Sequence, residues 1–465
     1  MKTTLNRKIL FVIFLSLFLG AIILTGCSGT KNPDITETGT ATAVITSSPT
    51  EIPTEVPTET PTPTPIPMPT YAAGESGERL DFSGDAPEEL ISVYEQPDSI
   101  ICGTEEIQNE NARMTKAAKL TDLLSAEDTI TAAALKKLLS SVKSAAPNLP
   151  IYKADKSSLS KDDYNALTEN AAIEPGDEDI KISLGIVTSR ANMRCLPTDE
   201  GLYTSNQLKY DMNQETELIL GQGVIIYGKS VDEKFYFVSC YNYTGWVNAE
   251  KIAITEDRNL WESFIKPSSF ITFTACLTEI SGEKADMGVI LPLEALDDAG
   301  FTVTLPVRND DGTLSAKSAT VSKDSAHVGY VPYTAANFII QACKYEGRAY
   351  GWGGLDDNVD CSGFLCAVLR SFGFYIPRDT GDQEKVVGVS NSVKNSSRTE
   401  TARLLDEAAT PAAVYSSGHV MLYMGKNTNG QFVLIHAYSV DSPITITAVS
   451  SLDGIRYVDY ILARE

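Results

Sequence analysis

One cysteine lies where a helix could make it reactive. Cys361 follows Asp360 and precedes a run, 362–372, whose apolar residues recur at helical spacing, so we expect it to begin a helix with a buried face. Backbone N–H groups and the positive dipole at a helix start favour the thiolate over the thiol. Cys366 lies further along the same helix and fits a packing role. Cys361 is therefore the candidate nucleophile.

A thiolate nucleophile needs a base, and the chain has 3 histidines. His419 and His436 lie in two apolar segments that are typical of paired strands, joined by a turn through residues 427–430. In such a hairpin the two imidazoles can lie side by side, so that one accepts the thiol proton while the other orients it. His327 precedes this region. Together with Cys361, the histidine pair predicts nucleophilic catalysis.

Several short motifs in the same part of the chain resemble a known family. They are YGWGG (350–354), DCSGF (360–364), PRDTGDQ (377–383) and GHVMLYMG (418–425), followed by the second histidine. Together they resemble the NlpC-type cell-wall cysteine peptidases, over residues 334–465. With the upstream regions, the chain is similar to the gamma-D-glutamyl-L-diamino acid endopeptidase subgroup, which trims wall peptides.

The resemblance implies a role for each catalytic position. Cys361 matches the nucleophile, which attacks the amide carbonyl at the side-chain carboxyl of D-glutamate. His419 matches the general base, and later the acid that protonates the leaving amine. His436 matches the third residue, which holds the imidazole. The backbone N–H of Cys361 is also a candidate oxyanion-hole donor, because helix-start N–H groups lack an intrahelical partner.

Five further residues are candidates for binding the substrate. By the resemblance, Asp360 and Ser362 line the end that binds the substrate's amino terminus, Tyr350 is a pocket residue, and Thr380 faces the site. Asp360 places a charge beside the nucleophile, which opposes thiolate formation, and binding of a free alpha-amine would explain it. A helix cap is the alternative explanation. Tyr243 is expected to close this end, restricting the enzyme to peptides with a free L-Ala.

The regions upstream should position this site. Residues 181–255 and 256–333 contain short strands broken by Gly, Pro and Asn, and R-x-N-M-R-x-x-P-T at 190–198 with YTGWV at 243–247 resembles the bacterial SH3-like barrel. Residues 76–180 have helical periodicity and no catalytic constellation. The expected fold is therefore α+β: a papain-like domain preceded by two SH3-like β-barrels and a helical supporting region.

The amino terminus predicts export and anchoring. A basic start and an apolar run end in Leu-Thr-Gly before Cys27, which resembles a lipoprotein signal peptide over residues 1–26 with Cys27 as the lipidation site. An uncleaved membrane helix, or a signal with an incidental cysteine, is the alternative. Residues 27–75 are rich in Thr and Pro and predict a disordered stalk. We therefore expect an extracytoplasmic protein, lipid-anchored to the bacterial cell membrane.

Composition limits the remaining function classes. The formal net charge of -23 makes nucleic acid an unsuitable partner. Seven cysteines remain after Cys27, an odd number without a CxxC pair, so neither a disulfide scaffold nor a zinc site is predicted. Cys195 and Cys240 could pair, but nothing requires it. No metal and no cofactor are expected.

Three functions follow from these features. The first is hydrolysis of murein peptides, L-Ala-gamma-D-Glu-diamino acid, at the gamma-D-glutamyl bond by a Cys-His-His mechanism. The second is a non-catalytic wall-binding lipoprotein, which would need only the barrels. The third is an amidase or acyltransferase on the same scaffold. The filled catalytic positions favour an enzyme, and YGWGG with DCSGF favours the peptidase.

Overall fold

The computed structural model describes residues 66–82, 85–142, 150–174, 176, 178–393, 397–407, 410–452, 454–455 and 457–460. The predicted signal peptide, Cys27 and residues 28–65 of the predicted stalk lie outside the described residues. Within the described ranges, every helix is too short or too polar to cross a membrane.

The end of the predicted stalk, residues 66–75, packs against the folded chain. The backbone oxygen of Ile66 accepts a hydrogen bond from Ser269 Oγ at 2.6 Å. The oxygen of Tyr71 accepts one from Thr104 N at 2.9 Å. These ten residues differ from the expectation of disorder because backbone groups far along the chain provide their hydrogen-bond partners.

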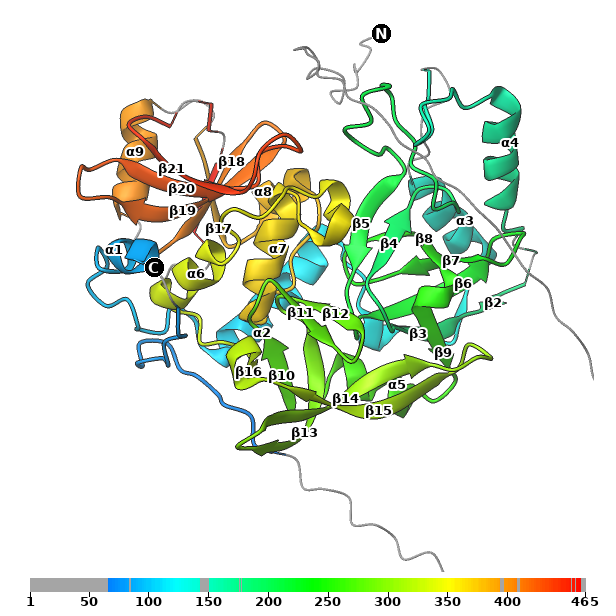
Figure 1. Ribbon diagram of the computed structural model, residues 1–465, viewed down its shortest axis with the longest axis horizontal. Coiled ribbons are helices and arrows are strands. Elements are labelled where there is room, and N and C mark those ends of the chain that lie inside the picture. Colours follow the sequence, from blue (N-terminus) through cyan, green and yellow to red (C-terminus); the bar gives the residue numbers. More distant parts are fainter. Residues whose placement is uncertain are drawn as a thin grey trace, which may run out of the picture. The chain divides into compact units, whose positions relative to one another are not determined.

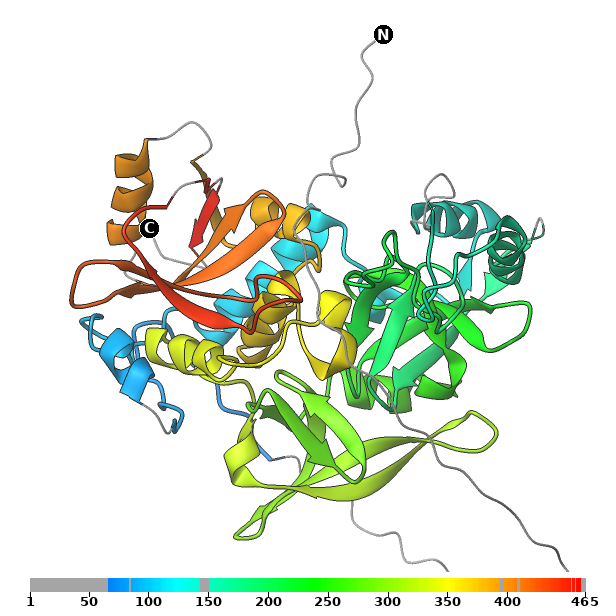
Figure 2. The same cartoon turned by 45° about the horizontal axis from the view of Figure 1, so that its top comes forward.

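The predicted helical region, 76–180, divides between two cores. The helices α1 (Asp85–Ile91) and α2 (Thr104–Ala118) contribute to the core of the carboxy-terminal part of the chain. The helices α3 (Ala132–Ser141) and α4 (Lys161–Asn170) pack against the first β-sheet. Figures 1 and 2 show α1 beside α6 and β19, whereas α3 and α4 lie beside strands of that sheet. The region is thus not one unit.

The first β-domain, residues 180–255, holds a seven-stranded antiparallel sheet in the order β5-β4-β8-β7-β6-β3-β9. The strands of this sheet are β3 (Ser183–Val187), β4 (Ala191–Arg194), β5 (Gln214–Leu218), β6 (Gly223–Lys229), β7 (Phe235–Ser239), β8 (Thr244–Asn248) and β9 (Ile252–Thr255). The short strand β2 (Ile180–Lys181) pairs with β1 (Thr129–Ile130) in a separate ladder.

This sheet is not a closed barrel, which corrects the prediction. Its two edge strands, β5 and β9, are not neighbours in the strand order. Each edge meets another part of the chain: Ile254 N of β9 donates to Gly312 O at 2.9 Å, and Gln214 of β5 donates to Gly353 O at 2.8 Å. An edge that is covered in this way needs no closure to hide its backbone groups.

The second β-domain, residues 256–333, also has an open sheet, with strand order β15-β14-β13-β10-β16 and a separate β11-β12 hairpin. Here too the prediction of a barrel is corrected. Its elements are α5 (Arg258–Ile265), β10 (Phe270–Phe273), β11 (Leu277–Ile280), β12 (Glu283–Asp286), β13 (Ile290–Asp297), β14 (Gly300–Arg308), β15 (Leu314–Val321) and β16 (Ala326–Val328).

The C-terminal domain, residues 334–460, packs helices on a six-stranded antiparallel sheet of order β17-β22-β18-β19-β20-β21. Its helices are α6 (Ala335–Cys343), the 3-10 helix η4 (Trp352–Asp357), α7 (Cys361–Ser371), α8 (Thr380–Val386) and α9 (Arg398–Glu407). Its strands are β17 (Val389–Ser392), β18 (Ala412–Ser416), β19 (His419–Lys426), β20 (Phe432–His436), β21 (Thr445–Val449) and β22 (Tyr457–Tyr460). The short 3-10 turns elsewhere are η1 (Leu123–Ser125), η2 (Ala249–Lys251) and η3 (Lys323–Ser325).

Two predicted features of this domain are confirmed. The helix α7 begins at Cys361, and all of its residues are buried. The strands β19 and β20 pair in antiparallel register, and their turn closes with Gly430 N donating to Asn427 O at 2.9 Å. The helix lies against β19, so the hairpin brings its histidines towards the start of the helix.

Candidate active site

The candidate nucleophile occupies the first position of α7. Asp360 caps the helix, and its carboxylate accepts a hydrogen bond from Gly363 N at 2.8 Å. The Cys361 side chain is 9% exposed. Its Sγ lies 3.9 Å from Thr380 Oγ1 and accepts a hydrogen bond from the backbone N–H of Val420. Since Val420 follows His419 in β19, the helix start and the histidine strand meet at the sulfur.

The two histidines lie side by side, as predicted. His419 Nε2 is 3.0 Å from His436 Nδ1, and His436 Nε2 is 3.4 Å from Thr447 Oγ1. With Nδ1 of His419 unprotonated, a proton on its Nε2 donates to His436, and a proton on His436 Nε2 donates to the threonine. This tautomer leaves Nδ1 of His419 unprotonated, the state that a general base requires.

The thiol itself is less acidic than the sequence suggested. Burial, and then the charge of Asp360, raise the pKa of Cys361 to about 11. Hydrogen bonds from Val420 and Thr380 and the charge of Arg378 act in the opposite direction. The sequence indicated that the helix start favours the thiolate and that Asp360 opposes it, but it did not reveal the burial of the sulfur, and here burial and the adjacent carboxylate outweigh the helix start. The resting site therefore holds a neutral thiol.

The histidine pair is neutral as well. Burial, and then the neighbouring His436, lower the pKa of His419 to about 4, while Asp360 opposes this shift. Burial also lowers the pKa of His436. A neutral imidazole beside a neutral thiol is the starting state of general-base catalysis, in which the proton moves as the sulfur attacks.

This state predicts an unusually acidic lower limit for activity. The base form of His419 is lost only as the pH falls through about 4, so kcat/KM should hold its plateau down to that value and then fall about tenfold per pH unit. The free energy of unfolding should also fall at acidic pH. His419 binds a proton near pH 6.5 in the unfolded chain but only near pH 4 in the folded chain, so the free energy of unfolding should fall as the pH drops from 6.5 towards 4. A pH–rate profile with a limb near 6.5 would contradict the buried neutral pair.

Asp360 is already paired within the protein, which the sequence did not predict. Arg378 donates to both carboxylate oxygens, at 2.9 and 2.8 Å. Gly353 N donates to Oδ2 at 3.0 Å and Ser362 Oγ to Oδ1 at 3.2 Å. Asp360 therefore caps the helix and neutralises an arginine, and both functions account for its charge without a bound amine.

The pocket residues come from two domains. Tyr350 is partly buried in the core around α7, and burial, followed by the charges of Asp360 and Cys361, raises its pKa. Tyr243, from the first β-domain, donates a hydrogen bond to Glu215. It lines a pocket of about 140 Å³ together with Arg378 and a second of about 200 Å³ together with Glu215. Tyr243 thus stands beside the arginine that holds Asp360.

Sequence reasoning overlooked four residues of this region. Arg378, Glu215 and Glu217 were missed because their partners lie far along the chain, although ETE at 215–217 placed two acids directly before an apolar run at 218–220. Tyr438 follows the second histidine by two positions. Its ring is 58% exposed and lies 5.7 Å from both imidazole centroids.

Cys195 and Cys240, which the sequence allowed to pair, are not joined in a disulfide. Among the described residues, no cluster of three or more His, Cys, Asp or Glu side chains could hold a metal ion.

Comparison with known proteins adds an independent line of evidence. Residues 347–452 match the model of the NlpC/P60 family, and residues 204–248 match the SH3 domain of the SH3b1 type. A gamma-D-glutamyl-L-lysine dipeptidyl-peptidase of Bacillus subtilis (strain 168) is 25% identical over 198 residues, which is 40% of this chain and 60% of that protein. The protein of the same name from Bacillus cereus (strain ATCC 10987 / NRS 248) is 26% identical over 212 residues, 41% of this chain and 59% of the relative.

A more local match and one solved structure complete the comparison. The probable endopeptidase p60 of Listeria welshimeri is 33% identical over 102 residues, 20% of this chain and 16% of that protein. A solved NlpC/P60 endopeptidase from Photobacterium damselae subsp. piscicida has a TM-score of 0.64 at 20% identity, over 80% of this chain and 92% of that one, and shows a shared fold. The chain spans about 60% of the length of the Bacillus relatives. Its C-terminal domain is thus an NlpC/P60 cysteine peptidase domain, and an SH3b domain precedes it.

Proposed function

We propose that this protein hydrolyses peptidoglycan peptides at the gamma-D-glutamyl–L-diamino acid bond. The observation that carries the proposal is the position of Cys361 at the start of α7, where its sulfur meets β19 at Val420, the residue after His419, while His419 is hydrogen-bonded to His436. The two Bacillus relatives, named for the gamma-D-glutamyl-L-lysine bond, support the choice of substrate. The sequence identity does not distinguish lysine from diaminopimelate as the residue after the bond.

The reaction follows from the geometry. As Cys361 Sγ attacks the amide carbonyl, Nδ1 of His419 takes the thiol proton. His436 Nδ1 then stabilises the His419 imidazolium by accepting a hydrogen bond from His419 Nε2. The carbonyl oxygen becomes an oxyanion, for which the N–H of Cys361 at the helix start is the proposed donor. His419 then protonates the leaving amine of the diamino acid, and a thioester remains. Water, deprotonated by His419, hydrolyses the thioester and frees the D-glutamyl carboxylate.

The preference for a free amino-terminal L-Ala is assigned here to Glu215 rather than to Asp360. Asp360 is paired with the cation Arg378. Glu215 lines a pocket with Tyr243 and accepts hydrogen bonds from Tyr243 and Cys195, neither of which carries a charge to neutralise it. A carboxylate in a pocket wall binds an ammonium group well. Tyr243 also lines a second pocket with Arg378, which contacts the residue before the nucleophile.

The test uses the chain without residues 1–26, none of which lies among the described residues. L-Ala-gamma-D-Glu-meso-diaminopimelate is supplied, and the products are followed by mass spectrometry beside Cys361→Ala. Release of L-Ala-D-Glu by the parent alone is the expected result. Release of glycan from intact wall would instead favour the amidase. Binding to wall without any product would favour a non-catalytic binding protein.

Changing Glu215 should separate recognition from chemistry. In Glu215→Gln the KM for the free-amine peptide should rise about 10- to 100-fold, the loss expected for one charge-assisted hydrogen bond, while cleavage of the N-acetylated peptide stays the same. Glu250→Gln, an exposed change in the same β-domain, is the matched control. An equal effect on both peptides would contradict amine recognition at this position.

The location of the protein completes the proposal. An NlpC/P60 hydrolase acts on wall peptides outside the cytoplasmic membrane, and lipid on Cys27 would hold this one at the membrane surface. Metabolic labelling with a fatty acid analogue should mark the parent and leave Cys27→Ala unmarked. Labelling of both chains would contradict Cys27 as the lipidation site.

A further inference from the structure

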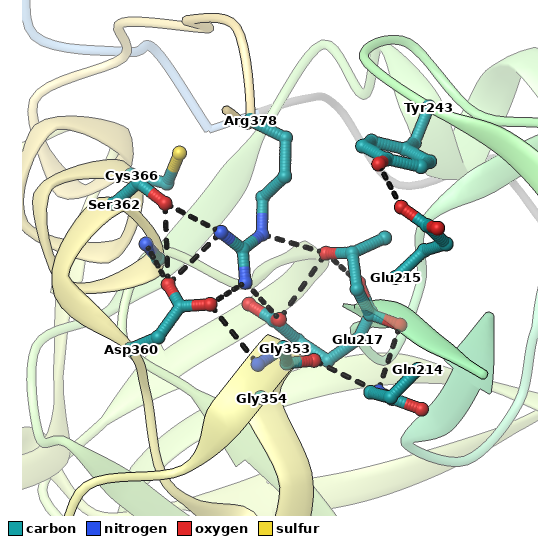
Figure 3. A network of polar contacts seen from close by, with 12 residues as sticks. Gln214, Glu215, Glu217, Tyr243, Gly353, Gly354, Asp360, Ser362, Cys366 and Arg378 are labelled. Carbon is teal, nitrogen blue, oxygen red and sulfur yellow. Dashed lines mark hydrogen bonds and ion pairs between the residues drawn. The ribbon is translucent and has the colours of Figure 1, made fainter. Parts of the chain in front are cut away.

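The first β-domain packs directly against the loop that leads into the nucleophile helix. Gln214 Nε2 donates to Gly353 O at 2.8 Å, and Gly353 N donates in turn to Asp360 at 3.0 Å. A Cβ on Gly354 would lie 2.7 Å from the Cβ of Glu217 and closer still to its carboxylate. The glycine pair of the YGWGG motif thus allows β5 to approach the loop (Figure 3).

A bulge in β5 makes this approach possible. Met193 pairs with Thr216 and Arg194 with Gln214, so Glu215 is an extra residue in the ladder between β4 and β5. A bulge locally re-aims the side chains of its strand, and bulges are frequent next to active sites. Here it directs both Thr216 and Glu217 at the same arginine.

Arg378 is the centre of the contact, and all three of its nitrogens are used. Nε donates to Thr216 Oγ1 at 2.8 Å, and Nη2 lies 3.4 Å from Glu217 Oε2. Nη1 donates to Ser362 Oγ at 2.8 Å, and both terminal nitrogens hold Asp360. Its side chain is 4% exposed. The planar guanidinium is therefore fixed from two domains at once, as Figure 3 shows.

This arrangement controls the charge beside the sulfur. The charged groups that shift the pKa of Cys361 are Asp360 from its own helix cap and Arg378 from the segment before α8, and Cys361 in turn acts on Tyr350 from the loop before η4. His419 precedes Val420, whose N–H reaches the sulfur from β19. Asp360 opposes a negative sulfur and Arg378 favours it. Glu217 Oε2 lies 3.4 Å from Nη2 of the same guanidinium, so it helps to fix Arg378 in place.

We propose that Glu217, with Thr216, is a positioning residue for catalysis: from the first β-domain it holds Arg378 against Asp360 and so sets the charge beside Cys361. The inference rests on the proposed role of Cys361 as nucleophile. It makes the first β-domain a part of the chemical step as well as a wall of the substrate pocket.

The test measures the nucleophile without substrate. Alkylation of Cys361 by iodoacetamide is followed against pH in the chain without residues 1–26, with the labelled peptide identified by mass spectrometry. In Glu217→Gln the guanidinium loses the carboxylate that holds it, so Arg378 neutralises Asp360 less well, the thiolate is disfavoured and the midpoint of alkylation should rise by about one pH unit. kcat for the peptide substrate should fall at least tenfold with KM unchanged, since Glu217 is not a pocket residue.

Two further variants separate the loss of a hydrogen bond to Arg378 from the loss of a charge. Thr216→Val removes the acceptor of Arg378 Nε without changing any charge, so it should lower kcat while moving the alkylation midpoint much less. Glu250→Gln should change neither quantity. An unchanged midpoint and unchanged kcat in a folded Glu217→Gln chain would overturn the proposal. If that chain does not fold, unchanged kcat in Thr216→Val would overturn it.

The two proposals can fail separately. If no chain releases a dipeptide, the proposed function is wrong, but a raised alkylation midpoint in Glu217→Gln would still support the coupling between domains. If the dipeptide is released and the midpoint does not move, the function stands and the positioning role falls.

Discussion

Replacing Cys361 with alanine is expected to abolish hydrolysis, with a loss of about 10⁴-fold or more in kcat. The sulfur forms the covalent bond, and the neighbouring Ser362 cannot substitute for it because its hydroxyl is bonded to Asp360 and Arg378. The melting temperature should change little, since alanine fits the helix start and removes one buried atom. Activity and thermal unfolding are measured on the same preparation.

Cys366→Ala is the matched control for this change. Cys366 lies in the same helix, buried against Pro377 O at 3.6 Å and Gln383 Nε2 at 3.5 Å. Its loss should cost about 1 kcal/mol of stability through the small cavity that it leaves and keep kcat within a few-fold. If the two variants lost activity equally, Cys361 would not be the nucleophile.

The largest expected effect on stability comes from Gly354→Ala. Gly354 has φ +85°, a left-handed conformation that costs a non-glycine residue about 1–2 kcal/mol. The added methyl group would also overlap Glu217, and relief of that overlap must move β5 away from the loop. We expect the free energy of unfolding in urea to fall by about 2–4 kcal/mol and kcat to fall with it.

Gly381→Ala provides the comparison. Gly381 lies in α8, and a Cβ there would meet nothing within 4 Å. Alanine is also the better helix former, by up to about 1 kcal/mol. This variant should be as stable as the parent or more stable. Equal destabilisation of both variants would mean that the contact between Gly354 and Glu217 is not what makes the first change costly.

The predictions that succeeded depended on short stretches of chain. The helix start at Cys361 is encoded by Asp360 and the apolar spacing behind it, and the histidine hairpin by two apolar runs around an Asn-to-Gly turn. Both are local patterns, in which the residues that decide the geometry are within about 20 positions of one another. The motif resemblance then identified the same residues independently.

The predictions that failed depended on contacts between distant segments. A carboxylate before a cysteine looks free in the sequence, because its partner Arg378 is 18 positions away and is itself held by Thr216, 162 positions earlier. The open sheets have the same cause. The strand pattern of the first β-domain is compatible with a barrel, and only the neighbouring domains, which cover β5 and β9, make closure unnecessary.

The position of α1 and α2 in the core of the C-terminal domain also governs when this protein can become an enzyme. Leu80 N reaches Asn337 across 257 positions, and Tyr375 N reaches Asn111 across 264. A chain that emerges amino terminus first, from a ribosome or a membrane channel, presents its early helices long before their partners exist. Domains usually fold in order of synthesis, but contacts this distant must wait for nearly the whole chain. The catalytic site is thus completed only after residues 334–460 have emerged.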